Sequence, residues 1–418
     1  MDKPLAAHLK QAATTSPSAT ALISHEGSWD FAKLQAAATE RAAKLSGRSG
    51  THQSCGSSLH LALDTIACSQ LGIPYWPAER ELPPLHIVPK KETALIIATS
   101  GSEGHPKHVM LSIGNLDTAA AASNARLPLH PGDLWLHCLP LYHIGGQAIL
   151  WRCLRTGAGI LLHDGFDARR VASDLHRYPV THISLVPAML ARLLEIDSPV
   201  PPSLQAVLIG GAALSANLYQ RAMTAGWPLR PSYGMSETAA QIASWQPADG
   251  PWQTGLAGRP LSGSEIRIGA DGRIHVRGPQ VMLGYMEGSG PDDEGWLITG
   301  DLGHIDTAGR LTVLGRADDI LISGGRNVHP QEIETCLAAL PGIRDIAITS
   351  KPDPVWGDKI IALLVGEISA DQVFAHARAH LPSAAIPREV KFFEALPRTT
   401  TGKLQRGELR RMADEGSH

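Results

Sequence analysis

The chain has 418 residues, of which 43% are hydrophobic and 18% charged, and its formal net charge is −3 at pH 7. This length allows two or three domains with a large hydrophobic core, and the balance of apolar and charged residues excludes a disordered chain. Because the net charge is small and no basic run alternates with aromatic residues, neither nucleic acid nor an anionic membrane is an expected partner.

The sequence predicts neither a membrane span nor a disulfide framework. It contains no run of about 18 apolar residues, and residues 1–4 do not open a secretory leader, so we expect a cytoplasmic protein. The cysteines are odd in number, widely spaced and without a C-x-x-C pair, which argues against disulfides and against a zinc site. We expect buried thiols at Cys55, Cys68, Cys138, Cys153 and Cys336.

The first informative elements are a Ser- and Gly-rich segment at 46–58, expected to be an irregular loop, and an apolar strand that ends at Ala98. The strand is followed by Thr99-Ser100-Gly101-Ser102-Glu103-Gly104-His105-Pro106-Lys107. Glycines let backbone N–H groups approach an anion, hydroxyl groups donate hydrogen bonds, and lysine supplies a positive charge. The loop is not a P-loop, because Pro106 precedes the lysine and His108 follows it. On its own it is equally consistent with a phosphate site and with a surface turn.

From residue 134 onward, short apolar runs alternate with helical patterns. Strands are expected at 134–139, 159–162, 182–186 and 206–209, and helices at 145–155, 167–177, 187–196 and 214–225. This alternation predicts a doubly wound, mainly parallel sheet, in which ligands gather at the carboxyl ends of the strands. The loop after Ala98, the turn at Gly210-Gly211 and the segment from Tyr233 each leave such an end.

The pattern changes twice toward the C-terminus. Between 255 and 315, alternating residues around Ala270-Asp271-Gly272 predict hairpins in a small twisted or barrel-like β unit. After residue 318, helices are expected near 330–339 and 371–381, and strands near 343–349, 359–365 and 390–393. The sequence thus predicts an N-terminal domain at 1–316 and a small α+β C-terminal domain at 317–418.

Four further segments follow the loop after Ala98 in a fixed order. They are Tyr233-Gly234-Met235-Ser236-Glu237-Thr238, Thr299-Gly300-Asp301, Gly315-Arg316-Ala317-Asp318-Asp319-Ile320 and Pro397-Arg398-Thr399-Thr400-Thr401-Gly402-Lys403. With the first loop they resemble the acyl- and aryl-CoA ligase, or adenylate-forming, superfamily, over nearly the whole chain. One such motif is a weak signal, whereas five in order are not expected by chance.

The resemblance implies a fold and a reaction. The implied fold is α/β, a large N-terminal domain with doubly wound mainly parallel sheets plus a small β unit, followed by a small mobile α+β C-terminal domain. The implied reaction is attack of a carboxylate on the α-phosphate of ATP to give an acyl-adenylate, followed by attack of the CoA thiol. The implied cofactors are ATP, Mg²⁺ and CoA, and the implied partner is a small carboxylic acid, with the chain acting alone or as a homodimer.

The resemblance also assigns nucleotide contacts. Tyr233 would pack on adenine, Asp301 and Arg316 would hold the ribose, and Glu237 would bind Mg²⁺. The implied cofactor contacts are Thr99, Ser100, Gly101, Ser102, Gly104, Lys107, Gly211, Tyr233, Gly234, Met235, Ser236, Asp301, Arg316, Gly324 and Gly325.

The resemblance implies three roles in the C-terminal domain, and the loop after Ala98 departs from the family pattern at one position. Lys403 would neutralise charge during adenylation, Asp318 would be the hinge about which the domain rotates, and Gly324-Gly325 would line the CoA channel. Glu103 stands where most members have threonine, and a carboxylate beside polyphosphate is repulsive unless it binds Mg²⁺ or points away.

The acyl pocket is assigned in the same way. Segment 140–146 matches the aromatic motif of the family, with His143 placed to contact the carboxylate, and the wall and floor would be Gly210, Gly211 and Met235. The lining segments look most like those of o-succinylbenzoate–CoA ligases of menaquinone biosynthesis. In that subgroup Arg192 would face the succinyl carboxylate, although its helix buries the opposite, leucine-rich stripe.

Two other functions stay open. A medium-chain or aryl acyl-CoA ligase would differ only in the pocket lining. A non-catalytic relative that senses nucleotide or acyl-adenylate is kept open by Glu103, whereas Lys403, Glu237 and Asp301 together argue for an enzyme.

Overall fold

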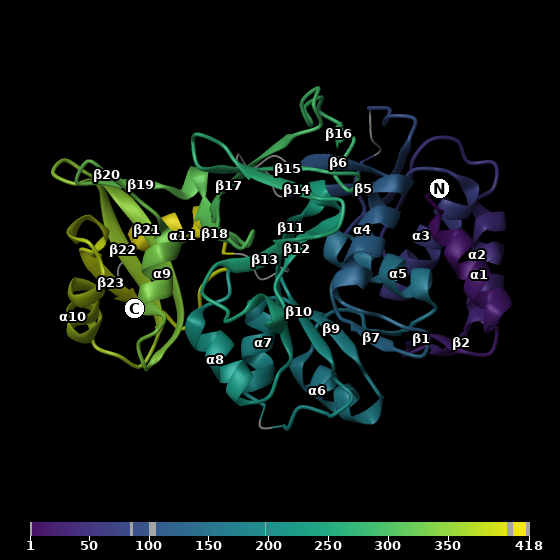
Figure 1. Ribbon diagram of the computed structural model, residues 1–418, viewed down its shortest axis with the longest axis horizontal. Helices are drawn as coiled ribbons and strands as arrows, with labels where there is room; N and C mark the ends of the chain where they lie inside the picture. The colour runs from purple at the N-terminus through teal and green to yellow at the C-terminus, as the bar shows by residue number, and fades with distance from the viewer. Residues whose placement is uncertain (1, 84–86, 100–105, 197, 399–403, 415–418) are drawn as a thin grey trace.

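The fold has two β-sheets with their helices before residue 317 and a third sheet after it. The computed structural model describes residues 2–83, 87–99, 106–196, 198–398 and 404–414. In Figure 1 the N-terminal helices lie at one end of the molecule and the third sheet lies at the other. The predicted α/β class with a small C-terminal α+β unit is confirmed.

The large sheet has a parallel part and an antiparallel part. In chain order its strands are β1 (Thr20–Ser24), β2 (Gly27–Asp30), β7 (Leu134–His137), β8 (Gly159–Leu162), β9 (His182–Leu185), β10 (Ala206–Ile209), β11 (Leu229–Met235), β12 (Ala240–Ser244), β13 (Leu256–Pro260), β14 (Glu265–Ile268), β15 (Arg273–Arg277), β17 (Leu297–Ile305) and β18 (Leu311–Arg316). Across the described residues the order is β14-β15-β17-β18-β13-β12-β11-β10-β9-β7-β8-β1-β2. Strands β11, β10, β9, β7, β8 and β1 are parallel, as strand–helix alternation requires.

The hairpins predicted at 255–315 are present as the antiparallel strands β13, β14, β15, β17 and β18, which pair with one another and join the parallel strands through β12. Strand β12 pairs with β11 on one side and with β13 on the other, at Ser232↔Ser244 and Ala243↔Pro260. Side-chain alternation identifies a hairpin but not the strand with which it pairs, so this junction through β12 could not be predicted.

A smaller sheet carries the phosphate-type loop. Its strands are β3 (His52–Ser54), β4 (Tyr75–Pro77), β5 (Thr93–Thr99), β6 (Lys107–Ser112) and β16 (Gly284–Tyr285), in the order β16-β6-β5-β4-β3. The expectation of an irregular loop at 46–58 is partly wrong, because β3 lies inside this segment and pairs with β4. The buried His52 side chain anchors that short strand.

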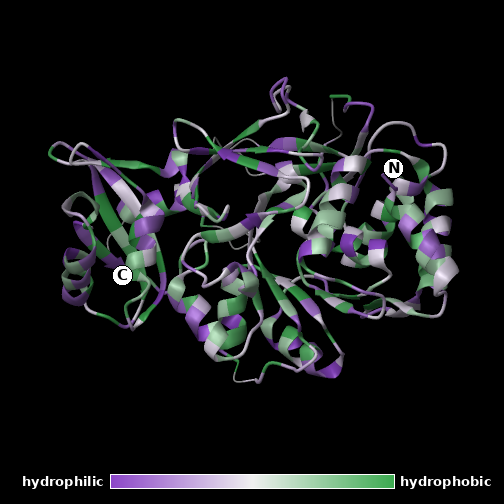
Figure 2. Cartoon of the chain, viewed as in Figure 1, coloured by the Kyte–Doolittle hydropathy of each residue, from purple (hydrophilic) through white to green (hydrophobic). Residues whose placement is uncertain are grey.

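Helices cover both faces of the parallel strands. They are α1 (Leu5–Thr15), α2 (Phe31–Leu45), α3 (Ser58–Leu71), α4 (Ile113–Arg126), α5 (Ile144–Thr156), α6 (Ala168–Arg177), α7 (Pro187–Leu194) and α8 (Ala216–Thr224). Trp135 and Ile160 share a core with α1, α4 and α5, whereas their neighbours Leu136 and Leu161 share one with α6 and α7. In Figure 2 the parallel strands are mostly hydrophobic and the helices carry both colours.

Helix α5 lies deepest of these helices. Every residue from Gly146 to Leu154 is buried, and the helix packs on α1 and α4. It ends at Gly157, whose φ of 74° is a conformation that favours glycine. Because α5 is enclosed on all sides, any polar side chain along it must find a partner inside the protein or in a ligand.

The C-terminal unit has its own core. Its strands are β19 (Leu321–Ser323), β20 (Arg326–Val328), β21 (Ile343–Asp353), β22 (Gly357–Gly366) and β23 (Glu389–Phe392), and its helices are α9 (Pro330–Leu337), α10 (Ala370–His380) and α11 (Arg406–Asp414). Its two hydrophobic clusters are built from residues 321–413. A single turn of 3-10 helix, Ala317–Asp319, joins it to β18. The predicted boundary at 316/317 coincides with this turn, and rotation about it stays a prediction.

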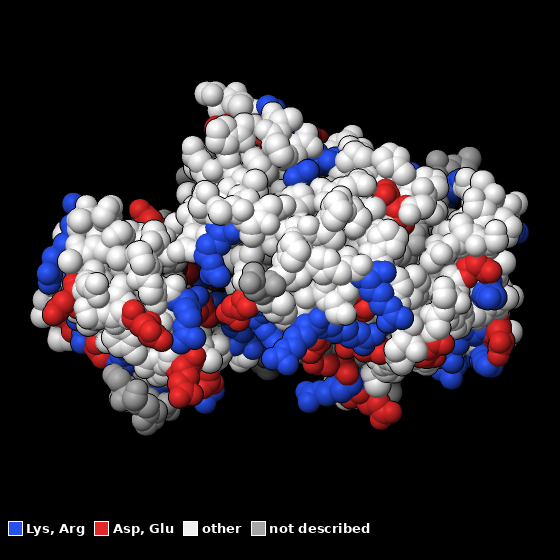
Figure 3. Space-filling view, turned by 90° about the horizontal axis from the view of Figure 1, so that it is seen from below, with Lys and Arg blue, Asp and Glu red and all other residues white. Residues whose placement is uncertain are grey.

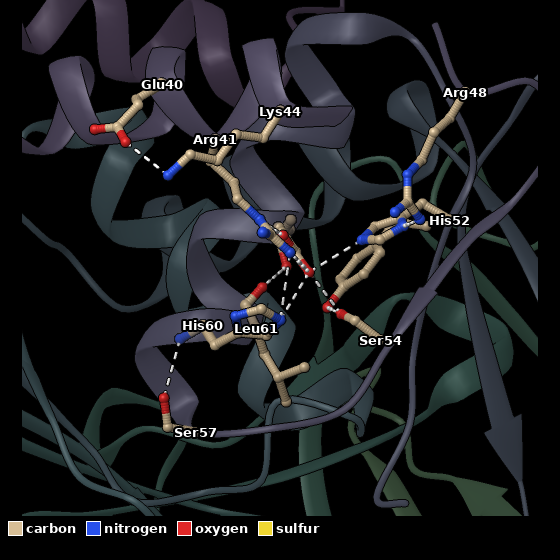
Figure 4. A network of polar contacts seen from close by, with 12 residues as sticks. Glu40, Arg41, Lys44, Arg48, His52, Ser54, Ser57, His60 and Leu61 are labelled. Carbon is tan, nitrogen blue, oxygen red and sulfur yellow. Dashed lines mark hydrogen bonds and ion pairs between the residues drawn. The ribbon is translucent and has the colours of Figure 1, made fainter. Parts of the chain in front are cut away.

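Asp64, on α3, is a buried charge whose partners Arg41, His52, Ser54 and His60 are labelled in Figure 4. His52 Nε2 and Ser54 Oγ donate to Oδ2 at 3.0 and 2.7 Å, Arg41 donates from Nε and Nη2, and His60 Nε2 lies 3.2 Å away. Burial alone would raise the pKa of Asp64, but these hydrogen bonds hold it well below its usual range. The network fastens α2, α3 and β3 to one another.

The surface mixes charges of both signs. Figure 3 shows Lys and Arg side chains next to Asp and Glu side chains on the face seen from below. No helix within the described residues is long and apolar enough to cross a membrane. The expectation of buried thiols holds for Cys68, Cys138 and Cys153 but is wrong for Cys55 and Cys336, which lie half-exposed in an outer loop and on α9.

Candidate functional site

Strands β5 and β6, which pair with each other as a hairpin that we name the phosphate hairpin, stand on either side of the phosphate-type loop in the sequence. Thr99 pairs with Lys107 at its base, and Thr99 Oγ1 donates to the Lys107 carbonyl at 3.2 Å. Lys107 is exposed, and its Nζ lies 5.4 Å from the centre of the Tyr285 ring. The predicted contacts Ser100, Gly101, Ser102 and Gly104, together with Glu103, lie outside the described residues.

The turn from β11 to β12 presents Glu237. Gly234 is required there, because a Cβ would lie 1.7 Å from the Ala240 carbonyl oxygen. Ala239 and Ala240 have φ of 49° and 92°, and among the described residues other than glycine they alone have positive φ. Such strain gathers at functional sites. In this turn Glu237 is half-buried, and its Oε1 accepts a 2.7 Å hydrogen bond from the Tyr285 hydroxyl.

Tyr233, Asp301 and Arg316 meet beside this turn. The Tyr233 hydroxyl donates to Asp301 Oδ2 at 2.7 Å, and Arg316 Nη1 donates to Oδ1 at 3.4 Å. Gly300 makes room for the guanidinium, since a Cβ would lie 2.5 Å from Arg316 Nη2. Burial, and then the charge of Asp301, hold the pKa of Tyr233 well above its usual range, so the phenol keeps its proton. The structure thus brings together three predicted ribose and adenine contacts.

A magnesium ion would find one protein carboxylate here. Within the described residues no three His, Cys, Asp or Glu side chains are arranged to hold a metal. Mg²⁺ in nucleotide sites keeps several waters and takes one or two carboxylates together with substrate phosphates. Glu237, next to the base of the phosphate hairpin, fits that donor set.

The predicted acyl pocket lies at the carboxyl ends of β7, β9, β10 and β11. His143 is the N-cap residue of α5, is half-buried, and lies with its ring 4.7 Å from that of Tyr142. A Cβ on Gly210 would lie 3.0 Å from Ser232 Oγ, and Gly211 has a φ of 79°. The two glycines therefore keep this edge of the sheet open beside Met235 at the end of β11.

Four buried side chains each have one polar atom without a hydrogen-bond partner, and we name them the unpaired polar cluster: Trp135, His137, Arg152 and Ser184. Their atoms Trp135 Nε1, His137 Nδ1, Arg152 Nε and Ser184 Oγ are all buried and unbonded. The register Leu136↔Ile183 sets His137 beside Ser184 on the sheet face toward α5.

Arg152 is the charged member of this cluster. Its guanidinium lies 5.6 Å from the Trp135 ring and makes no hydrogen bond or ion pair within the part of the chain that the structure describes. Burial lowers the pKa of Arg152 to about 10, so the side chain is still charged at pH 7. Burial also lowers the pKa of His137 to about 4; its Nε2–H donates to the Gly146 carbonyl, which leaves Nδ1 as an acceptor.

Arg192 and the C-terminal residues lie elsewhere. Arg192 is exposed on α7, with its guanidinium 5.5 Å from the Phe166 ring. Gly324 and Gly325 form the β19–β20 turn, with φ of 56° and 71°. Asp318 lies 3.5 Å from Arg316. Their predicted roles in acid binding, the CoA channel and the hinge stay predictions, and Lys403 lies outside the described residues.

Comparison with known proteins agrees with this geometry. The model of the AMP-binding enzyme family matches residues 57–286, and that of the AMP-binding enzyme C-terminal domain matches residues 332–403. The chain belongs to the AMP-binding enzyme family. The first model covers the phosphate hairpin, the unpaired polar cluster and Glu237, and the second ends at Lys403.

Relatives within the AMP-binding enzyme family include 2-succinylbenzoate–CoA ligase of Bacillus pumilus, 36% identical over 334 residues, which are 76% of this chain and 69% of that protein. The structure of o-succinylbenzoate CoA synthetase from Bacillus subtilis with the acyl-adenylate intermediate OSB-AMP has a TM-score of 0.85 and 30% identity, covering 96% of this chain and 97% of that one. The same synthetase with ATP and magnesium ion has a TM-score of 0.85 and 30% identity, covering 96% and 99%.

Sequence reasoning did not single out the unpaired polar cluster or Tyr285. Arg152 and Ser184 carried a signal, since each is a polar residue inside an otherwise apolar run, but only tertiary packing shows that they are unpaired. Tyr285 follows Gly284 in a short strand, and nothing local connects it with Glu237, 48 residues earlier.

Proposed function

We propose that the protein is an AMP-forming acid–CoA ligase that activates o-succinylbenzoate with ATP and transfers the acyl group to CoA. The names of its relatives support the acid, the nucleotide and the thiol. The observation in the structure that carries the choice of acid is Arg152 on α5, whose side chain is buried and makes no hydrogen bond or ion pair among the described residues. A monocarboxylic acid would leave this charge without a partner, whereas o-succinylbenzoate has a second carboxylate.

In the first half-reaction a carboxylate oxygen attacks the α-phosphorus of ATP and pyrophosphate leaves. Tyr233 would stack on adenine while its hydroxyl and Arg316 keep Asp301 oriented toward the ribose hydroxyls. The hairpin residues Thr99 and Lys107, with Ser100, Gly101, Ser102 and Gly104, would hold the β- and γ-phosphates, and Glu237 would hold Mg²⁺. When bound, the ion neutralises charge on the phosphate oxygens.

At the other end of the pocket, the unpaired polar cluster would bind the second carboxylate. Arg152 offers a charge-assisted hydrogen bond, and Ser184 Oγ and Trp135 Nε1 offer neutral donors. The acid would thus be held at both ends, with the reacting carboxylate near His143 and between Gly211 and Met235. Contacts at both ends would fix the orientation of the acid, which lowers the entropic cost of reaching the transition state.

In the second half-reaction the CoA sulfur attacks the acyl carbon and AMP leaves. Lys403 would serve adenylation and then withdraw, with the C-terminal unit turning about Asp318 so that Gly324 and Gly325 line a path for the thiol. The 3-10 turn at Ala317–Asp319 is the short connection such a rotation needs. The cytoplasmic location and the homodimer remain predictions.

The test is thioester formation by the purified protein with ATP, Mg²⁺ and CoA, using o-succinylbenzoate, benzoate and octanoate. We expect kcat/KM for o-succinylbenzoate to exceed that for benzoate by about a hundredfold or more, because benzoate leaves Arg152 unpaired. Comparable use of benzoate or octanoate would favour the aryl or medium-chain ligase. ATP binding without pyrophosphate exchange for any acid would favour the sensor.

A variant of Lys403 tests whether the two half-reactions use different states of the protein. Lys403→Ala should nearly abolish adenylation while largely sparing thioester formation from supplied acyl-adenylate. Equal loss of both half-reactions would contradict the two-state scheme.

A further inference from the structure

Tyr285 contacts both sides of the proposed phosphate site. Its hydroxyl donates to Glu237 Oε1 at 2.7 Å, and the Lys107 ammonium lies 5.4 Å from the centre of its half-buried ring. Glu237 belongs to the turn after β11, and Lys107 belongs to the phosphate hairpin. A single side chain therefore joins the proposed magnesium carboxylate to the proposed phosphate lysine.

The segment that carries Tyr285 is itself fixed to both elements. The Met282 N–H donates to the Glu237 carbonyl at 2.9 Å, and the Met286 N–H donates to the His108 carbonyl at 2.9 Å. The His108 ring also bonds Glu287 at 2.7 Å. These backbone anchors place the phenol between the two elements without help from its own hydrogen bond. The backbone of Tyr285 is thus fixed to both elements, and its side chain can orient those of Glu237 and Lys107.

We propose that Tyr285 is a positioning residue for the magnesium–triphosphate complex, holding the Glu237 carboxylate and the Lys107 ammonium in the orientation that this complex requires. The inference rests on the proposed function. The hydroxyl occupies Oε1 of Glu237 and leaves Oε2 for the ion, and such outer hydrogen bonds fix metal-binding carboxylates. The ring face attracts the lysine ammonium and limits its range.

The experiment is calorimetric titration of the full chain with ATP, once with Mg²⁺ and once with EDTA. For Tyr285→Phe, which keeps the ring, we expect the affinity for MgATP to fall about tenfold and the affinity for metal-free ATP to stay within about twofold. Tyr285→Leu also removes the ring from Lys107 and should weaken both. Tyr219→Phe is the matched control, because Tyr219 stacks on Trp252 and takes no part in the proposed site.

A purely structural tyrosine would give other results. Unchanged MgATP affinity in Tyr285→Phe, or equal losses with and without Mg²⁺, would overturn the inference. Glu237→Gln supplies a second route: if both side chains act through one carboxylate, adding Tyr285→Phe to it causes no further loss of MgATP affinity, and additive losses would also overturn the inference. Failure of the unmodified protein to bind MgATP would instead overturn the proposed function.

Discussion

Asp64 and Arg152 are both buried charges in the N-terminal part of the chain, and their surroundings are opposite. Asp64 is fully enclosed and accepts hydrogen bonds from His52, Ser54 and Arg41. Arg152 is 3% exposed, lies against Trp135 and has no polar partner among the described residues. A paired buried charge holds elements together, whereas an unpaired one is unfavourable until something binds it. The comparison therefore separates scaffold from binding site.

The difference can be expressed as free energy. Lowering the pKa of Arg152 from 12.5 to about 10 corresponds to roughly 3 kcal/mol against the charged form in the folded protein. For Asp64 the pKa moves in the direction that favours the charged form. Natural proteins keep such unfavourable features mainly where function requires them. An anionic ligand at Arg152 would offset this energy on binding.

The largest effect is expected for Asp64→Ala. It leaves Arg41, His52 and His60 without their common partner, and breaking a buried pair in this way costs about 3–5 kcal/mol. Urea unfolding should show this loss in the free energy of unfolding, while the ratio of o-succinylbenzoate to benzoate activity stays unchanged. Glu40→Ala is the matched control, because its ion pair with Lys44 is exposed to solvent and contributes little to stability. A changed acid preference in Asp64→Ala would contradict the conclusion that Asp64 acts only on stability and not on acid binding.

The second-largest effect is expected in the pH dependence of the unfolding free energy, to which His137 and Asp64 contribute in different pH ranges. The pKa of His137 falls from 6.5 to about 4 on burial, so between these values the unfolded chain binds a proton that the native chain does not. Its contribution to stability therefore falls as pH decreases from 6.5 to 4, by roughly 3 kcal/mol in total. Asp64, with a lowered pKa, loses its contribution only below 3.8. Burial also lowers the pKa of His182 to about 4, so His137→Gln should reduce, without removing, the slope of the unfolding free energy against pH between 6.5 and 4. An unchanged slope would contradict the assignment.

The third prediction concerns Arg152, the unpaired charge of the comparison. Arg152→Met removes the unpaired charge but keeps an apolar side chain of similar length, so stability should stay the same or rise. The preference for o-succinylbenzoate over benzoate in kcat/KM should fall about a hundredfold. Arg192→Met is the matched control, because Arg192 is exposed and its guanidinium lies 5.5 Å from the centre of the Phe166 ring. Loss of preference in Arg192→Met alone would return the second carboxylate to Arg192.

Local patterns predicted most of the fold because they depend on nearest neighbours. The helix expected at 145–155 is α5, Ile144–Thr156, and the strand expected at 159–162 is β8. The motifs predicted Tyr233, Asp301 and Arg316, which the structure brings into contact. Neither the pairing of β12 nor the isolation of Arg152 could be predicted, because both are set by segments far away in sequence.

Helix α5 limits how one acid could contact both residues that the proposal assigns to it. Arg152 comes nine residues after His143, which is two and a half turns and about 13 Å along the axis, so the two side chains start on opposite sides of the helix. An acid that bound both would have to pass the first turns of α5, which favours a long, flexible diacid over a short one.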